Sequence, residues 1–263
     1  IKKILRSSIS DLICKGVKPK YYFIAGSGNK KNFTKNNLKK ISNSLREEQK
    51  KYDLLLGGGD TTFSTKLSFT ITSVGYSKKI IYRNQSNVNN DIYVTGNLGD
   101  SFIGLQVLKN KIKLNKSKMK YFINKYYMPD IQNKFSKNLL SLATSSMDIS
   151  DGLITDLNKL INKQNVSYKI YEKSIPVSRN LNNLINSKNL NKIDLVTNGD
   201  DYQILFTARP NNARIINKLS KSLGVKISKI GTILSGKNKS LILDQKGREI
   251  ANNVSGYVHQ FWS

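Results

Sequence analysis

Short apolar segments of this sequence run directly into turns that combine glycine with aspartate. Residues 53–56 are expected to form a short buried strand that leads into GGGDTT at 57–62, and residues 91–95 a strand that leads into GNLGDS at 96–101. A third such turn, GDD, lies at 199–201. Only 17 acidic residues stand against 44 lysines and arginines. Aspartates gathered beside glycines are therefore candidates for chemistry rather than for solubility.

Amphipathic helices are expected between these strands. Thr34 is a suitable N-cap for a helix whose apolar stripe, Leu38, Ile41 and Leu45, follows the i, i+3, i+7 spacing. The alternation of strands and helices predicts an α/β (α+β) fold of two lobes, and a new unit begins near Asn89. We therefore expect an N-terminal lobe over 1–88 and a C-terminal lobe over 89–263. Further helices are expected before Gly16, over 131–143, after residue 152 and around 215–223, and a strand over 202–207.

The composition narrows the possible functions. The net charge of +27 suits nucleic-acid binding, but the lysines are spread along the chain and no aromatic-interleaved basic strand is present. A general bias towards Lys, Asn and Ile explains the charge as well, so no specific nucleic acid is expected, although the positive field attracts anionic substrates. No apolar run approaches the ~18–20 residues that span a bilayer, so no membrane is expected. A single cysteine, Cys14, fits a reducing, cytoplasmic location.

The residue inventory favours a hard metal ion over zinc. One cysteine and one histidine, His259, cannot form an ordinary zinc site, whereas aspartate oxygens suit Mg²⁺. Asp148 and Asp151 are three residues apart at the start of an expected helix, with Ser150 between them. That spacing can place three oxygens on one side, which exceeds what an N-terminal cap requires. Asp60 follows three glycines and is a second candidate metal ligand, the alternative being a tight glycine turn.

Two further acidic positions have simpler alternatives. Asp200 and Asp201 are adjacent, so in an extended chain they face opposite ways, and one is expected to contact a ligand while the other braces the loop. The alternative is a charged turn before a strand. Asp11, taken alone, reads as a surface charge on the first helix.

The ordered set of these motifs resembles the thiamine-monophosphate kinase family. The motifs run through nearly the whole chain: Ser10-Asp11, GGDTT at 58–62, IYVTG at 92–96, GDS at 99–101, DISDGL at 148–153, GDDY at 199–202 and Gly256-Tyr257. The resemblance implies the two-lobed fold of the aminoimidazole-ribonucleotide-synthetase-like superfamily, with an N-terminal lobe that dimerises through its strands. ATP and several Mg²⁺ ions are then expected in the cleft between the lobes, and thiamine monophosphate as the phosphate acceptor.

The resemblance also implies roles for individual residues. By match to the family motifs, the metal ligands are Asp11, Asp60, Asp148 and Asp151; ATP contacts Gly59, Asp60, Arg83 and Ser150; and the thiamine substrate contacts Asp200 and Tyr257.

The sequence departs from the family pattern in three places. The family carries an earlier Gly-Asp-Asp segment that is not found here, so the chain is expected to be N-terminally truncated, with an incomplete N-terminal lobe. The family usually has Gly-Gly-Glu-Asp where this chain has NGDD at 198–201, which shortens the reach of Asp200. The surroundings of Arg83 match poorly. The alternatives are another ATP-using enzyme of the superfamily, an inactive fragment or pseudoenzyme, and a basic nucleic-acid-binding protein.

Overall fold

The computed structural model describes residues 1–250. Its strands are β1 (Pro19–Gly28), β2 (Leu55–Phe63), β3 (Ser68–Gly75), β4 (Asp91–Thr95), β5 (Ala143–Asp148), β6 (Val166–Tyr171), β7 (Ile204–Ala208), β8 (Ile227–Ser235) and β9 (Leu241–Leu243). Its helices are α1 (Lys2–Ile13), α2 (Lys35–Tyr52), α3 (Asp100–Leu108), α4 (Lys116–Tyr127), α5 (Asn133–Leu142), α6 (Leu153–Ile161), α7 (Arg179–Lys188), α8 (Lys192–Val196) and α9 (Ala213–Leu223), with short 3₁₀ turns at Glu172–Ser174 and Pro210–Asn212. Within these residues no helix is long and apolar enough to cross a bilayer.

A small three-stranded sheet forms the first unit, in the order β2-β1-β3. β1 pairs with β2 in parallel and with β3 antiparallel. Thr34 caps α2 as the sequence predicts, because its hydroxyl accepts a hydrogen bond from the backbone N–H of Asn37 at 3.2 Å. Tyr22 and Ile24 alternate with Phe23 along β1, so one face of the sheet packs against α1 and α2 while Phe23 stays exposed on the other.

The glycine run lies in a strand and not in the turn that the sequence suggests, whereas the metal role of Asp60 stays a prediction. Residues 57–60 lie inside β2 rather than in a loop or a tight turn, and the register with β1 skips Gly57, which forms a β-bulge. A Cβ at Gly59 would lie 2.0 Å from the carbonyl oxygen of Ile24, so the close approach of the strands requires glycine there. The expected buried strand at 53–56 is wrong in its burial, because β2 is an edge strand and both Leu55 and Leu56 are half-exposed.

A six-stranded mixed sheet forms the second unit, in the order β5-β7-β4-β8-β6-β9, antiparallel except between β6 and β9. Residues that alternate along its central strands face two cores. Ile92, Val94 and Leu205 pack with α6, whereas Tyr93 and Phe206 pack with α5 and α9. α3, α4 and α7 share a third, smaller core. The α/β (α+β) class expected from the sequence is thus present.

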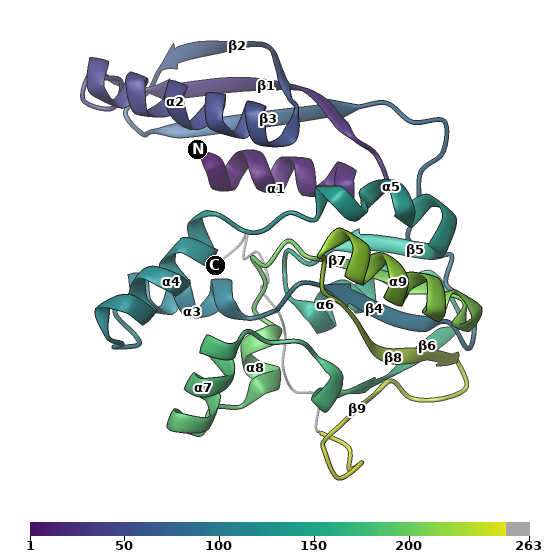
Figure 1. Ribbon diagram of the computed structural model, residues 1–263. Helices are drawn as coiled ribbons and strands as arrows, with labels where there is room; N and C mark the ends of the chain where they lie inside the picture. Colours follow the sequence, from purple (N-terminus) through teal and green to yellow (C-terminus); the bar gives the residue numbers. More distant parts are fainter. Residues whose placement is uncertain (251–263) are drawn as a thin grey trace.

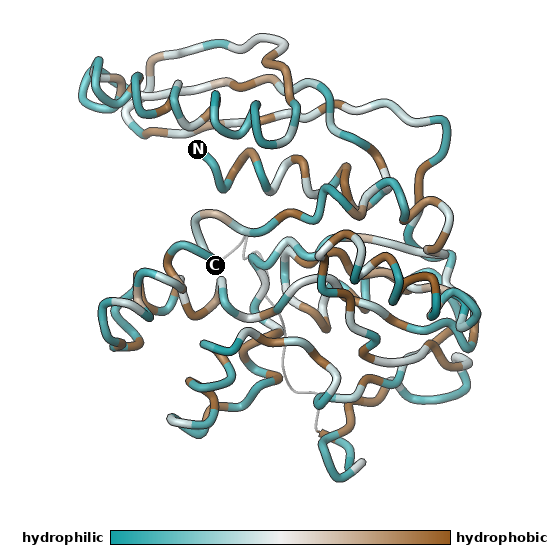
Figure 2. Tube along the Cα trace, viewed as in Figure 1, coloured by the Kyte–Doolittle hydropathy of each residue, from teal (hydrophilic) through white to brown (hydrophobic). Residues whose placement is uncertain are grey.

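The first helix lies between the two units. Figure 1 shows α1 between the small sheet and the part of the chain that contains α5 and the large sheet. Leu5, Ile9 and Ile13 of α1 are fully buried in a core that also holds Phe135 of α5 and Phe206 of β7. In Figure 2, brown hydrophobic stretches recur along α1, whereas the tube of α2 is mostly teal and hydrophilic. Burial of one helix by both units fixes how the lobes sit against each other.

A buried ion pair joins α1 to α2 and to the segment before α5. The guanidinium of Arg6 donates two hydrogen bonds of 2.7 Å to the carboxylate of Glu48 and one of 3.0 Å to the carbonyl oxygen of Pro129. The side chains of Arg6 and Glu48 are only 6% and 2% exposed. Paired charges at that depth are satisfied only together, so removing one leaves the other buried and uncompensated.

We expect Glu48→Ala to lower the free energy of unfolding by about 3 to 5 kcal/mol, because Arg6 would remain buried without its partner. Glu47→Ala is the matched control on the same helix, since Glu47 is exposed and pairs with Lys2 at the surface; its loss should cost about 1 kcal/mol or less. Urea unfolding of both variants gives the comparison. Equal losses in the two variants would contradict the assigned importance of the buried pair.

Candidate active site

The segment 148–152, which begins at the last residue of β5, carries three of the candidate ligands and is shaped by a single carboxylate. Oδ2 of Asp156, on the first turn of α6, accepts the backbone N–H groups of Ser150, Asp151 and Gly152 at 2.9, 2.8 and 3.1 Å. Asp156 is fully buried, and burial raises its pKa while these donors and Lys159 oppose the shift. The aspartate that organises the loop was not identified from the sequence.

Gly152 permits the loop to turn into α6. Its φ is +118°, and a Cβ there would lie 1.9 Å from the carbonyl oxygen of Thr197. No residue with a side chain fits this position without moving the chain at 197. The glycine in the DISDG motif therefore has a steric role, and the loop is held against the segment that leads to the third glycine–aspartate turn.

Asp148 ends β5 in a buried position beside α1. Ser10 donates a hydrogen bond to Oδ2 of Asp148, which ties α1 to the loop. Burial raises the pKa of Asp148 to about 6; the nearby carboxylate of Asp11 adds to the shift, and the Ser10 hydroxyl opposes it. Partial burial raises the pKa of Asp11, and the positive charges of Lys15 and Arg83 oppose that shift. Asp11 and Asp148 thus lie in one neighbourhood, and the charge of Arg83 acts on Asp11 although Arg83 lines neither of the cavities described below.

Residues of this loop line two cavities. One of about 440 Å³ is lined by Asp11, Asp148 and Ser150 together with residues of α1 and β3. The other, of about 660 Å³, is lined by Ser150, Asp151 and Asp200 together with residues of α1, α3 and α4. Ser150 and Tyr202 line both cavities, so the two spaces adjoin. Cavities of this size accommodate small organic ligands.

The turn at 199–202 is joined to the 148–152 loop by backbone hydrogen bonds. The N–H of Asp200 donates to the carbonyl of Ser150, and the N–H of Tyr202 donates to the carbonyl of Ile149, both at 2.8 Å. Asp200 and Tyr202 have φ of +63° and +51°, a left-handed conformation that is costly for residues with side chains. The expected strand over 202–207 consequently begins only at Ile204, because Tyr202 is not extended.

Asp200 and Asp201 lie in different surroundings, although the chain at Asp200 is left-handed and not extended. Asp200 lines the larger cavity. Asp201 is buried, and its Oδ2 accepts the N–H of Gly99 at 2.8 Å, just before α3. Burial raises the pKa of Asp201 to about 8, with the backbone N–H of Gly99 opposing the shift and the carboxylate of Asp100 adding to it. Asp201 therefore braces the turn, whereas Asp200 lines the larger cavity and pairs there with Lys3.

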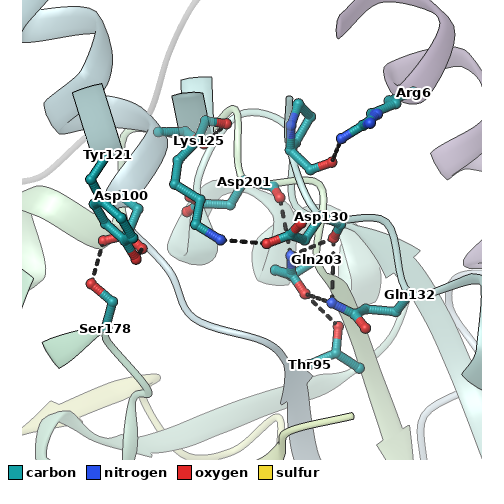
Figure 3. A network of polar contacts seen from close by, with 12 residues as sticks. Arg6, Thr95, Asp100, Tyr121, Lys125, Asp130, Gln132, Ser178, Asp201 and Gln203 are labelled. Atoms are coloured by element: carbon teal, nitrogen blue, oxygen red, sulfur yellow. Dashed lines mark hydrogen bonds and ion pairs between the residues drawn. The ribbon is translucent and has the colours of Figure 1, made fainter. Parts of the chain in front are cut away.

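A polar network lies beneath this turn (Figure 3). The side-chain amide of Gln203 donates to the carbonyl of Asp130 at 2.8 Å, and its oxygen accepts from Thr95 and Gln132 at 3.0 Å each. In the same view, the carboxylate of Asp100 accepts hydrogen bonds from Ser178 and Tyr121 at 2.7 and 2.8 Å. These satisfied bonds keep the buried polar groups in place. Asp100 is thereby occupied by structural contacts.

The remaining predicted site residues lie apart from the two cavities or outside the described chain. Gly59 and Asp60 lie on the exposed edge strand β2, where Oδ1 of Asp60 accepts the N–H of Thr61 at 2.7 Å. Arg83 is exposed in the segment between β3 and β4. Tyr257 lies outside the described residues. Within residues 1–250 no three acidic, histidine or cysteine side chains converge on one metal position. A metal ion shared by Asp60, Asp148 and Asp151 therefore stays a prediction from the motifs.

The donor set still suits a hard cation. Asp11 and Asp148 bring two carboxylates to one cavity, with the Ser150 hydroxyl at its rim. The pKa of Asp148 is raised because burial and the nearby carboxylate of Asp11 disfavour its ionised form. A bound divalent cation would compensate the negative charge of that form. The carboxylate of Asp151 forms an ion pair with the ammonium group of Lys159. The same Nζ atom of Lys159 lies 3.2 Å from Oδ1 of Asp156. Oxygen ligands of this kind, completed by phosphate oxygens and water, are those that Mg²⁺ prefers.

Comparisons with known proteins decide the family. Residues 2–77 match the family model for the AIR synthase related protein, N-terminal domain, and residues 87–244 match that for its C-terminal domain. The chain is 33% identical to the thiamine-monophosphate kinase of Buchnera aphidicola subsp. Schizaphis graminum, over 98% of this chain and 79% of that protein. The chain belongs to the thiamine-monophosphate kinase family. It is accordingly an enzyme, and the resemblance read from its motifs is confirmed.

Solved structures agree on the architecture of this kinase family. The structure of AaThiL complexed with AMPPCP and TMP has a TM-score of 0.83 to this chain at 22% identity, covering 99% of this chain and 81% of that one. HypE of E. coli, a hydrogenase maturation protein, has a TM-score of 0.79 at 15% identity, covering 97% and 79%. At such identities the likeness shows the fold, which both relatives share with this chain.

We expect Asp201→Asn to change how stability depends on pH. Because the folded-state pKa of Asp201 is about 8 and an unfolded aspartate has a pKa near ~4, the unfolded chain binds fewer protons between these values. Asp201 therefore makes the protein less stable as pH rises from about 4 towards 8. Asparagine keeps an acceptor for Gly99 and cannot ionise, so the variant should lose less stability over this range in urea unfolding. A pH dependence identical to that of the parent chain would contradict the raised pKa.

Proposed function

We propose that this chain transfers the γ-phosphoryl group of ATP directly to thiamine monophosphate, forming thiamine diphosphate, with Mg²⁺ as the required cation. The observation that carries the proposal is the pair of adjoining cavities that share Ser150 and Tyr202, in a chain of this kinase family. One cavity offers carboxylates for a cation and the other offers Asp200 for an organic ligand. Two bound ligands would then meet at the 148–152 loop.

The chemistry suits this residue inventory. The acceptor is already a phosphate anion, so no general base is needed to activate it. The enzyme must instead hold two polyanions together, and two unit charges ~4 Å apart repel by about 1 kcal/mol even in water and by more in a cleft. Magnesium, when bound, supplies the positive charge that offsets this repulsion. The protein contributes positioning and fixed donors, which is how phosphoryl transfer is generally catalysed.

The proposed roles follow the family motifs. Asp148 and Asp11 hold metal at the smaller cavity, with Asp151 at the adjoining one. The assignments of Gly59 and Asp60 to ATP, and of Asp60 to metal, rest on the GGDTT motif alone, since β2 lies at the edge of the small sheet. The complete proposed set is Asp11, Asp60, Asp148 and Asp151 for metal; Gly59, Asp60, Arg83 and Ser150 for ATP; and Asp200 and Tyr257 for the thiamine substrate.

Asparagine at position 148 tests the metal role. We expect Asp148→Asn to reduce Mg²⁺-dependent formation of thiamine diphosphate from ATP and thiamine monophosphate by at least about a hundredfold, because a buried metal ligand loses its charge. Asp194→Asn is the control, since Asp194 is an exposed acid on α8. Product is quantified by chromatography, and circular dichroism verifies folding. Parental turnover in a folded Asp148→Asn variant would contradict the proposed metal site.

We further propose that two copies of the chain associate through the small sheet, forming a homodimer. Five large apolar side chains of this unit are substantially exposed: Phe23, Leu55, Leu56, Phe63 and Leu67. Phe63, at the end of β2, is 82% exposed. Contiguous exposed apolar residues on an edge strand are typical of an interface that is covered by a partner.

Phe63→Asp should therefore weaken self-association by at least about tenfold, because a charge would enter an apolar contact. Ile215→Asp, on α9 of the other unit, is the control, since Ile215 is also half-exposed. Sedimentation equilibrium of the two variants and the parent chain gives the dissociation constants. A monomeric parent chain, or equal weakening by both substitutions, would contradict the proposed interface.

An ATP-using enzyme of the same superfamily with another acceptor is the second candidate, favoured by the shared fold with HypE. Thermal shift distinguishes the two, because a ligand that binds only the folded state raises the melting temperature. Stabilisation by thiamine monophosphate in the presence of an ATP analogue and Mg²⁺ is expected for the thiamine-monophosphate kinase.

We also place the chain in the cytoplasm, where a lone, buried Cys14 thiol stays reduced.

A further inference from the structure

A lysine from the first helix occupies the larger cavity. Nζ of Lys3 lies 2.9 Å from Oδ1 of Asp200 and 3.3 Å from the centroid of the Tyr126 ring. All three residues line the cavity of about 660 Å³. The side chains of Lys3 and Asp200 are 19% and 28% exposed, so the ammonium group is largely withdrawn from water. A positive charge is thus held between an aromatic face and a carboxylate.

This arrangement is a binding position for a cation. An aromatic ring attracts a positive charge over its face, most strongly where water is excluded, and a carboxylate beside it adds direct ionic attraction. Burial lowers the pKa of Lys3 and its contact with Asp200 opposes that shift, as expected for an ammonium that leaves water to reach a partner. Burial and the charge of Asp200 both raise the pKa of the Tyr126 hydroxyl. The ring and the carboxylate therefore face one small space.

Asp200 keeps its position in the cavity although its backbone conformation is energetically unfavourable. Its left-handed φ of +63° is held by the hydrogen bond from its N–H to Ser150, and its Oδ1 also accepts the Tyr202 hydroxyl at 3.1 Å. Strained residues persist where the surrounding structure fixes them, commonly at ligand sites. Lys3, by contrast, has four rotatable methylene groups and can leave the position without moving the backbone.

We propose that Tyr126 and Asp200 form the subsite for the positively charged ring of the substrate, and that Lys3 fills this subsite as a tethered cation until the substrate displaces it. The inference rests on the proposed function, in which Asp200 already contacts the substrate. It adds the aromatic face of Tyr126 and the competing charge of Lys3. Thiamine carries a quaternary thiazolium ring, which matches a ring face beside a carboxylate.

The competing lysine also confers selectivity. A ligand that must displace Lys3 binds only to those molecules in which the subsite is open. Its apparent affinity is therefore its intrinsic affinity multiplied by the fraction of open molecules. A cationic ring regains the same aromatic and ionic contacts when it takes the place of Lys3. A neutral ring of similar size leaves Asp200 without a partner, which costs binding free energy. Lys3 therefore excludes neutral aromatic ligands from the cavity.

Thiamine is the probe for this proposal, since it carries the cationic ring and has no phosphate that Lys3 could contact. Binding to the full chain is measured by calorimetry. Lys3→Met should tighten thiamine binding by about three- to tenfold, because the competing charge is gone while the apolar stem remains. In a Tyr126→Leu background the same substitution should tighten binding by less. Lys2→Met is the matched control, because Lys2 pairs with Glu47 outside the cavity, and it should leave binding unchanged.

Thiochrome, the neutral oxidised form of thiamine, supplies a readout that a merely structural role of Tyr126 would not produce. The preference for thiamine over thiochrome should fall at least about threefold in Tyr126→Leu. Unchanged or weaker thiamine binding in Lys3→Met, with the parent chain binding normally, overturns the inference and leaves the proposed function standing. A folded parent chain that binds neither thiamine nor thiamine monophosphate overturns both.

Discussion

The carboxylate of Asp156 is the constraint on which the rest of the site depends. Its one oxygen holds three successive backbone N–H groups, so the 148–152 loop can adopt one path only. The carbonyl groups of Ile149 and Ser150 then accept hydrogen bonds from backbone N–H groups of the 199–202 turn. These hydrogen bonds hold two residues of the turn in an unfavourable left-handed conformation. Through these contacts one buried side chain fixes the relative positions of the residues that line both cavities.

The aspartates around the 148–152 loop differ in the groups that compensate their charge. Acids with structural roles are satisfied by donors, as Asp201 is by Gly99 and Asp100 by Ser178. Asp148 instead shares its surroundings with the carboxylate of Asp11, which adds to the rise in its pKa. An enzyme that must bring two anions together benefits from acids whose charge is compensated only by added cations, because the cations then arrive with the ligands. Two acids thus line one cavity where the proposed chemistry needs a cation, although the Ser10 hydroxyl binds Asp148 and the charges of Lys15 and Arg83 act on Asp11.

Local patterns predicted local structure well, and long-range contacts poorly. The Thr34 cap, the β4 strand and the helix after Gly152 follow from short-range rules and are present. The sequence does not distinguish a strand from a turn at the glycines 57–59, because a β-bulge and a turn both favour glycine. Only the close approach of the Ile24 carbonyl oxygen to Gly59, a contact between two strands, distinguishes them. Lys3 and Tyr126 are 123 residues apart, so no spacing rule could pair them. Asp156 had a weak signal, an acid in the first turn of a helix, which ordinarily marks only a favourable dipole contact.

Anomalous scattering from Mn²⁺ in crystals grown with a non-hydrolysable ATP analogue tests the central claim most directly. The account predicts an anomalous peak within about 2.3 Å of a carboxylate oxygen of Asp148, with Asp11 or a phosphate oxygen completing its ligands. Bound nucleotide with no metal at Asp148, or metal held only by residues far from the 148–152 loop, would contradict it.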